Sequence, residues 1–153
     1  MILQSINPAT DELISEYNEH QWDEVNLALE KATESQKEWM NVSAANRANT
    51  LLKMAATLRE QTEALAFLIS VEMGKVIGEA RSEVEKCARV CEYYASQGYS
   101  FLQSKPVETE ATESYVIYKP LGIVLAIMPW NFPFWQLFRC AEPAMMAGNS
   151  VIL

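Results

Sequence analysis

The chain has 153 residues, of which 50% are hydrophobic and 21% are charged, and its formal net charge at pH 7 is −8. That length suffices for one domain with a hydrophobic core, and the composition is typical of globular proteins. The acidic balance, with only 12 lysines and arginines, argues against a nucleic-acid partner, because phosphate binding requires clustered cations.

Neither an export signal nor a membrane anchor is visible in the sequence. Met1 is not followed by a basic segment and a long apolar run. The longest apolar run, around Leu121 to Met128, is too short to cross a bilayer. The three cysteines form no CxxC pair, which fits a reducing compartment. We therefore expect a cytoplasmic protein without a membrane partner.

Cysteine and histidine positions give little support for a metal centre. Cys87 and Cys91 lie four residues apart on a predicted helix, where the spacing favours two small core residues over a metal or redox pair. His20 is the only histidine, so neither a zinc site nor a Ser-His-Asp triad is expected.

Helical periodicity dominates the first two thirds of the chain. Residues 1–20 carry turn chemistry around a short apolar piece and predict a small strand or arm. Apolar spacing then predicts four helices: Trp22–Trp39, one that begins after the N-cap Ser43, one from Thr62 to the left-handed cap Gly74, and one from about Val76 to Leu102. Together they predict an antiparallel helical layer.

The pattern changes at Lys105-Pro106. Ser114–Tyr118 is rich enough in aromatic and β-branched residues to predict a strand. Lys119–Gly122 has proline and glycine at the positions that a type I turn favours.

A strand, a helix and a second strand are predicted for the last 31 residues. The continuous apolar run from Ile123 is typical of a buried parallel strand. Pro133 suits the first position of a helix that runs to about Ala147, and Ser150 begins another strand. This order predicts a β-α-β unit with a right-handed crossover. Two strands alone make a poor sheet, so we expect the chain to be the amino-terminal part of a larger α/β protein.

The corner Pro129–Pro133, with the sequence PWNFP, is the strongest candidate site. Its two prolines restrict the backbone around Trp130 and Asn131, at the strand end where open α/β sheets bind ligands. The amide of Asn131 suits a neutral hydrogen-bond donor, and the alternative is a turn residue that bonds its own backbone.

Several motifs together give the chain a family resemblance. They are INPAT (Ile6–Thr10), the segment Trp39–Arg47, EMGK (Glu72–Lys75) with EAR (Glu79–Arg81), KPLGIVLAIMPWNFP (Lys119–Pro133) and EPAMMAGNSVIL (Glu142–Leu153). Over essentially its whole length the sequence resembles the NAD(P)-dependent aldehyde dehydrogenase superfamily, most closely its succinate-semialdehyde dehydrogenases.

The resemblance implies a fold and a division of the chain. The fold would be α/β and aldehyde-dehydrogenase-like, with a helical layer and the first β-α-β of a Rossmann-like cofactor domain, incomplete here. Residues 1–104 would form the helical part of the cofactor-binding domain, residues 105–122 a strand and turn of the oligomerisation region, and residues 123–153 the truncated β-α-β unit. The parent protein would be a homo-oligomer, a dimer or a tetramer.

The resemblance also assigns roles at the corner. Asn131 would donate its amide to the oxyanion of a cysteine thiohemiacetal. Residues that would line the NAD or NADP cofactor are Ile127, Met128, Pro129 and Trp130, although Trp130 could instead be a core residue. Trp135 and Gln136 would line the substrate tunnel, and Arg139 would bind the remote carboxylate of succinate semialdehyde. The alternative for Arg139 is an ion pair with Glu142 on a solvated face.

The implied activity is oxidation of an aldehyde to its carboxylic acid. In the family, the nucleophilic cysteine and the general-base glutamate lie beyond residue 153, so we expect the 153-residue chain alone to be inactive. Cys140 does not match the nucleophile's position. Glu142 stands where the family often has glycine or alanine, so its burial would be unfavourable. The alternatives are a related semialdehyde or acyl-forming dehydrogenase, and a non-catalytic helical interaction module.

Overall fold

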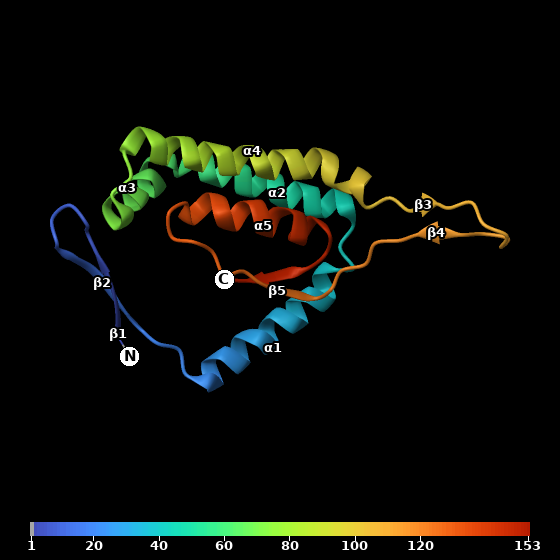
Figure 1. The fold of residues 1–153 in the computed structure, drawn as a ribbon, viewed down its shortest axis with the longest axis horizontal. Helices are drawn as coiled ribbons and strands as arrows, with labels where there is room; N and C mark the ends of the chain where they lie inside the picture. Colours follow the sequence, from blue (N-terminus) through green and yellow to red (C-terminus); the bar gives the residue numbers. More distant parts are fainter. Residues whose placement is uncertain (1) are drawn as a thin grey trace.

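Three helices lie side by side and form the main layer of the molecule, with a short parallel sheet and a further helix beside it (Figure 1). The computed structural model describes residues 2–153. Its helices are α1 (Trp22–Trp39), α2 (Ala44–Glu60), α3 (Thr62–Met73), α4 (Ile77–Phe101) and α5 (Pro133–Met146). Its strands are β1 (Ile2–Ile6), β2 (Leu13–Asn18), β3 (Lys105–Pro106), β4 (Tyr115–Val116), β5 (Ile123–Leu125) and β6 (Ser150–Ile152).

The core lies between α2, α4 and α5, with α4 in contact with the other two and with α3. The buried stripe of α4 consists mostly of small residues, which let the neighbouring helices approach closely. The two helices α4 and α5 approach closely at Gly98, since a Cβ atom there would lie 2.4 Å from Cγ of Met146 on α5. The fully buried residues of this core include Leu51, Ile69, Val84, Cys87, Cys91 and Met146.

The predicted helices are confirmed almost to the residue. Ser43 caps α2, with its hydroxyl oxygen accepting from the Asn46 N–H at 3.3 Å. Gly74 ends α3 in the left-handed conformation, with φ of 70°. The helical apolar spacing includes Leu52 and Leu68, but both side chains are exposed. Leu52 directly follows the buried Leu51, and Leu68 directly precedes the buried Ile69, so each points about 100° away from its buried neighbour.

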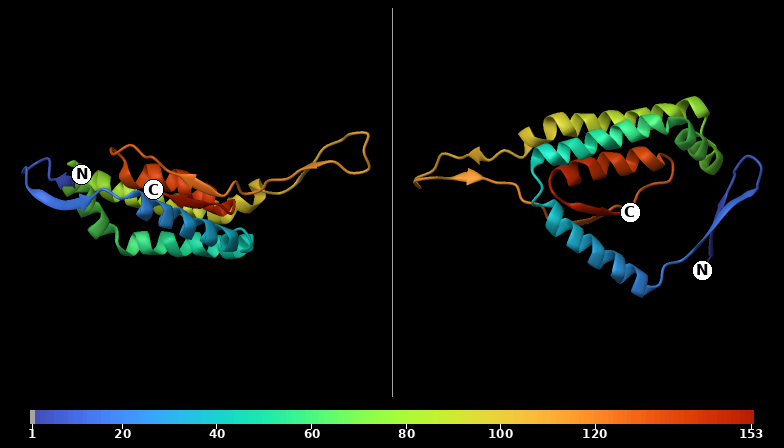
Figure 2. Two further views of the ribbon diagram at one scale, coloured as in Figure 1. Left: turned by 90° about the horizontal axis from the view of Figure 1, so that it is seen from below. Right: turned by 180° about the vertical axis from the view of Figure 1, so that it is seen from behind.

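The strands form three separate pairs. β1 and β2 form an antiparallel hairpin. The predicted small strand or arm of residues 1–20 therefore contains two strands. β3 and β4 pair antiparallel, so the predicted strand Ser114–Tyr118 is confirmed only over Tyr115–Val116. β5 and β6 pair in parallel, with Ile123 opposite Ser150, which confirms the predicted β-α-β order. The β3–β4 arm extends well beyond the helices (Figure 2).

Side-chain bonds to the backbone join α1 to the turn that leads into β6. The indole N–H of Trp39 donates to the Met145 carbonyl at 2.8 Å, and the Gln36 amide donates to the Gly148 carbonyl at 3.2 Å. From inside that turn, Asn149 accepts from the N–H groups of Leu121 and Gly122 at 2.7 and 3.0 Å. These bonds fix the sheet relative to the helices. Within residues 2–153, no helix combines the length and apolar character needed to cross a bilayer.

Candidate functional site

The corner between β5 and α5 presents its side chains outward. Strand pairing continues one residue past β5, because the Ala126 N–H donates to the Ile152 carbonyl at 2.7 Å. After that bond the chain leaves the sheet, and Ile127 and Trp130 are 84% and 78% exposed. Asn131 is also exposed. Its side-chain amide makes no hydrogen bond to any residue in the described part of the chain, so it does not cap its own turn.

The corner is held from α4 by a buried carboxylate. Helix α5 begins with Pro133, and its N-cap Phe132 contributes no side-chain bond. Glu83 supplies the missing acceptor, since one carboxylate oxygen accepts from the N–H groups of Phe134 and Trp135 at 3.1 and 3.0 Å. A carboxylate at this end of a helix also interacts favourably with the helix dipole.

Lys75 completes this anchor. Its ammonium donates to the other oxygen of Glu83 in a buried ion pair, and it also stands 3.8 Å from the centre of the Phe132 ring. Lys75, in the segment after α3, thus contacts both Glu83 on α4 and Phe132 at the corner. Sequence reasoning missed both residues, although a glutamate inside the apolar stripe of α4 signals a buried partner.

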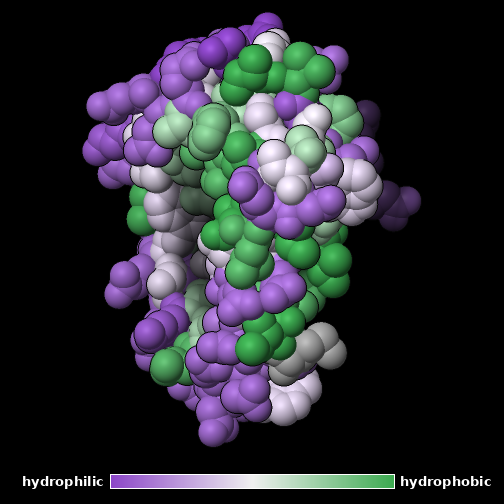
Figure 3. Space-filling view, turned by 90° about the vertical axis from the view of Figure 1, so that its left-hand side faces the viewer, coloured by the Kyte–Doolittle hydropathy of each residue, from purple (hydrophilic) through white to green (hydrophobic). Residues whose placement is uncertain are grey.

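Two cavities flank the corner. The first, of about 570 Å³, is lined by Trp130, Phe134 and Met73 among others. It lies at the end of the molecule where apolar side chains are exposed between polar margins (Figure 3). The second, of about 470 Å³, is lined by Lys75, Ser82, Glu83, Lys86, Phe132 and Trp135. Asn131 lies in the chain between Trp130 and Phe132, which line different cavities.

The predicted cofactor residues lie next to one another on this loop. Ile127, Pro129 and Trp130 are exposed, and Met128 is half-buried. The alternative reading of Trp130 as a core residue is wrong, because its side chain lines the first cavity and is largely exposed. The loop therefore offers accessible apolar surface at the end of a parallel strand.

The predicted substrate residues are not all brought together. Trp135 lines the second cavity, while Gln136 and Arg139 are not part of its lining. Arg139 lies one helical turn after Trp135 and is exposed. The alternative, an ion pair with Glu142 on a solvated face, is not formed, because Glu142 is fully buried whereas Arg139 is exposed.

Glu142 is an unpartnered buried acid. It is 0% exposed, and neither carboxyl oxygen has a hydrogen-bond partner among the described residues. Burial raises the pKa of Glu142 to about 7, and the nearby Cys91 thiol offsets part of that rise. Glu142 is thus buried without a partner, a placement expected to be unfavourable for a glutamate.

Two of the three cysteines are core residues. Cys87 and Cys91 are fully buried in the core, as expected, and burial is the main cause that raises the pKa of both thiols. Protonated thiols are poor nucleophiles. Cys140 is half-buried on α5. Residues 2–153 contain no cluster of three or more His, Cys, Asp or Glu side chains suited to a metal ion.

A parallel strand that ends in an exposed, anchored corner and leads into a helix places this chain among α/β proteins, a class whose open sheets bind ligands at the strand ends. Sequence comparison gives the particular family. The chain belongs to the aldehyde dehydrogenase family, whose profile matches residues 1–153. This assignment confirms the recognised superfamily and the predicted α/β fold class.

Relatives with high similarity are succinate-semialdehyde dehydrogenases. The chain is 43% identical over 153 residues to the probable succinate-semialdehyde dehydrogenase [NADP(+)] of Synechocystis sp., covering 100% of this chain and 34% of that protein. It is 41% identical over 149 residues to the succinate semialdehyde dehydrogenase [NAD(P)+] Sad of Escherichia coli, covering 97% and 32%. The chain thus spans about a third of the length of these relatives.

Solved structures agree with the fold. The succinic semialdehyde dehydrogenase of Streptococcus pyogenes, in complex with NADP+, matches with a TM-score of 0.92 and 32% identity, over 97% of this chain and 33% of that one. The structure of Gox0499 matches with a TM-score of 0.95 and 33% identity, over 99% of this chain and 33% of that one.

Proposed function

We propose that this chain supplies the oxyanion donor and part of the cofactor and substrate walls of an NAD(P)-dependent aldehyde dehydrogenase that oxidises succinate semialdehyde. The observation that carries the proposal is Asn131, an exposed amide without an internal partner on a corner that Glu83 and Lys75 anchor. The named activity of the relatives in Synechocystis and Escherichia coli supports the choice of aldehyde.

The amide of Asn131 suits the charge that develops during thiolate attack. A neutral donor stabilises an oxyanion without competing for the proton, and removing one such donor typically costs about 100- to 1,000-fold in kcat. The anchor below the corner matters here, because a donor is effective only if it is already in place when the charge forms. Glu83 and Lys75 are positioning residues for Asn131 in this proposal.

The residues of the loop fit a dinucleotide cofactor. Ile127, Pro129 and Trp130 present exposed apolar side chains, and the N–H groups of residues 127, 128, 130 and 131 make no backbone hydrogen bond within the described chain. Ile127, Met128, Pro129 and Trp130 would therefore hold NAD or NADP by packing and by backbone groups. The bound nicotinamide supplies the hydride acceptor.

The assignment of segments is also part of the proposal. Residues 1–104 serve as the helical part of the cofactor-binding domain, residues 105–122 as an oligomerisation arm, and residues 123–153 as the first β-α-β unit. Support for a homo-oligomer comes from the β3–β4 arm, which exposes Tyr115, Val116 and Ile117 beyond the helices.

Arg139 is proposed to bind the remote carboxylate of the substrate. Its guanidinium has no ion-pair partner within 4 Å among residues 2–153, and its planar donors suit a carboxylate. An Arg139→Ala variant that kept its preference for semialdehyde acids over alkyl aldehydes would contradict this role.

The test compares Asn131→Ala with Asn26→Ala in the protein expressed from its complete reading frame. Asn26 is an exposed asparagine on α1, away from the corner. We expect Asn131→Ala to lower kcat for succinate semialdehyde by about 100-fold or more with an unchanged unfolding temperature, and Asn26→Ala to have no effect. Equal kcat values for wild type and Asn131→Ala would refute the proposal.

A second measurement concerns residues 1–153 alone. We propose that they do not reduce NAD(P)+ with an aldehyde, because Cys87 and Cys91 are buried with raised pKa values and the family's nucleophile and base lie beyond residue 153. Aldehyde-dependent NAD(P)H formation by the purified 153-residue chain would contradict this statement.

A further inference from the structure

Lys86 is an unpaired cation in the second cavity beside the corner. Its ammonium stands 3.8 Å from the centre of the Trp135 ring, and both residues line the cavity of about 470 Å³. No carboxylate among residues 2–153 lies within ion-pair distance of Lys86, whereas Lys75, in the same lining, is paired with Glu83.

The other charges of the cavity leave the Lys86 end positive. Glu83 is already engaged by Lys75 and by two backbone N–H groups. Glu79 is the remaining acid of the lining, but it lies seven residues before Lys86 on α4, about 10 Å away along the helix axis. A ligand that reaches Lys86 therefore meets an uncompensated positive charge above an indole face.

The cavity that Lys86 lines lies next to the proposed oxyanion donor, Asn131. Phe132 and Trp135 line it, and Asn131 immediately precedes Phe132. A ligand whose carbonyl lies at Asn131 would thus extend past these two rings toward Lys86. The volume lies in the range of small-molecule pockets.

We propose that Lys86 is a second cationic contact, besides Arg139, for the remote carboxylate of the substrate, while the Trp135 ring packs against the methylene groups of the substrate. This inference rests on the proposed function, since it concerns the same substrate. Lys86 becomes a residue that determines specificity for aldehydes with a terminal carboxylate. Lys86 acts from α4, whereas Arg139 is on α5 and is not part of the cavity lining.

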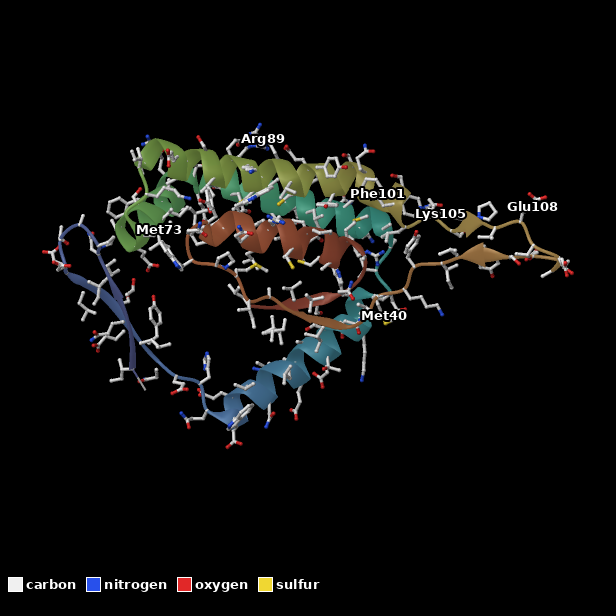
Figure 4. The ribbon with its side chains drawn as sticks, in the orientation of Figure 1. Met40, Met73, Arg89, Phe101, Lys105 and Glu108 are labelled. Carbon is white, nitrogen blue, oxygen red and sulfur yellow. The ribbon has the colours of Figure 1, made fainter. Side chains whose placement is uncertain are left out.

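The kinetic test uses Lys86→Met, with Lys105→Met as the matched control, in the protein expressed from its complete reading frame. Lys105 also stands over an aromatic ring, 5.7 Å from the centre of Tyr118, but lies on the β3–β4 arm (Figure 4). Lys86→Met is expected to raise the KM for succinate semialdehyde about tenfold, because a hydrogen bond to a charged group is lost. The kcat, and the KM for butanal, should stay unchanged.

Lys86→Arg should restore most of the preference for the acid, because it keeps the charge. Lys105→Met should behave as wild type. The inference is overturned if Lys86→Met leaves both KM values unchanged or raises them equally.

A binding measurement separates this inference from the proposed function. Calorimetric titration should show that succinate binds and neutral succinamide does not, with succinate affinity about tenfold weaker in Lys86→Met. A protein that oxidises no aldehyde but shows this loss would refute the proposed function and support the Lys86 site. A protein that oxidises succinate semialdehyde but whose Lys86→Met variant binds succinate normally would support the proposed function and overturn the Lys86 site. Absence of succinate binding to the wild type would overturn the Lys86 site.

Discussion

Lys75 and Glu83 form an ion pair whose side chains are only 8% and 2% exposed. The pair lies under the corner, and the second oxygen of Glu83 holds the first N–H groups of α5. Taking two charges out of water is costly, and their attraction offsets that cost only when the remaining hydrogen-bonding groups are also satisfied. Here the first N–H groups of α5 satisfy the second oxygen of Glu83. Because the corner leads directly into α5, the position of Asn131 depends on this ion pair.

Glu83→Gln should destabilise the protein strongly. The substitution removes the charge that faces Lys75 and leaves a buried ammonium without its counterion, which typically costs about 3 to 5 kcal/mol. Urea denaturation of the variant and the wild type measures the change in unfolding free energy. The same variant should lower kcat more than it changes KM, because Asn131 loses its fixed position.

Glu85→Gln is the control for Glu83→Gln. Glu85 is also on α4 but pairs with Arg59 at the surface, with a side chain 42% exposed. Its loss should cost less than about 1 kcal/mol. Similar losses for the two variants would contradict the role assigned to Glu83. Lys75→Met combined with Glu83→Gln should cost less than the sum of the single changes, because neither partner is left alone.

Glu142 should make the protein less stable as pH rises toward neutrality. Its carboxyl group has a pKa of about 7 when folded, above the ordinary value of 4.5. Below pH 4.5 the group is protonated in both states. Between the two pKa values the unfolded chain releases a proton that the folded chain retains, so the unfolded state is favoured by up to about 3 kcal/mol above pH 7.

Glu142→Gln tests this linkage, because it removes the titration and keeps the shape. Relative to wild type, the variant should gain stability between pH 5 and pH 8, as measured by denaturation at both values. Glu38→Gln, at an exposed acid on α1, should show no such gain. If the stability difference between Glu142→Gln and wild type were the same at both pH values, Glu142 would not have a raised pKa in the folded protein.

Arg59 is expected to contribute through geometry as well as charge. It forms bidentate bonds to Glu85 and Glu92 across α2 and α4, and these bonds raise the pKa of its guanidinium. Arg59→Lys keeps the charge but cannot make the same four-bond arrangement, so it should lower the unfolding temperature slightly. In 1 M salt the difference should become smaller, because the pairs are exposed to solvent. An undiminished difference would point to packing instead.

Local pattern predicted the helices well because each buried stripe repeats within one element. The spacing of Ala80, Val84 and Cys87 is visible in the sequence and buried in the structure. The anchor of the corner could not be found this way, since Glu83 and Phe134 are 51 residues apart and meet only after α4 and α5 pack. The position of Lys86 over Trp135 depends on the same packing. Asn131 was predictable from its motif, but its lack of an internal partner was not.

Gly98→Ala should destabilise the protein, although alanine favours helices. A Cβ atom at residue 98 would lie 2.4 Å from Cγ of Met146, and Met146 is itself fully buried on α5. Overpacking of this kind typically costs about 1 to 3 kcal/mol, more than the gain of up to about 1 kcal/mol from replacing a helical glycine. Gly78→Ala is the matched control on the same helix, because nothing lies within 4 Å of its Cβ position. Thermal unfolding should show a loss for Gly98→Ala and an equal or higher midpoint for Gly78→Ala. If both variants were stabilised, α4 and α5 would have to lie farther apart at Gly98 than the structure has them.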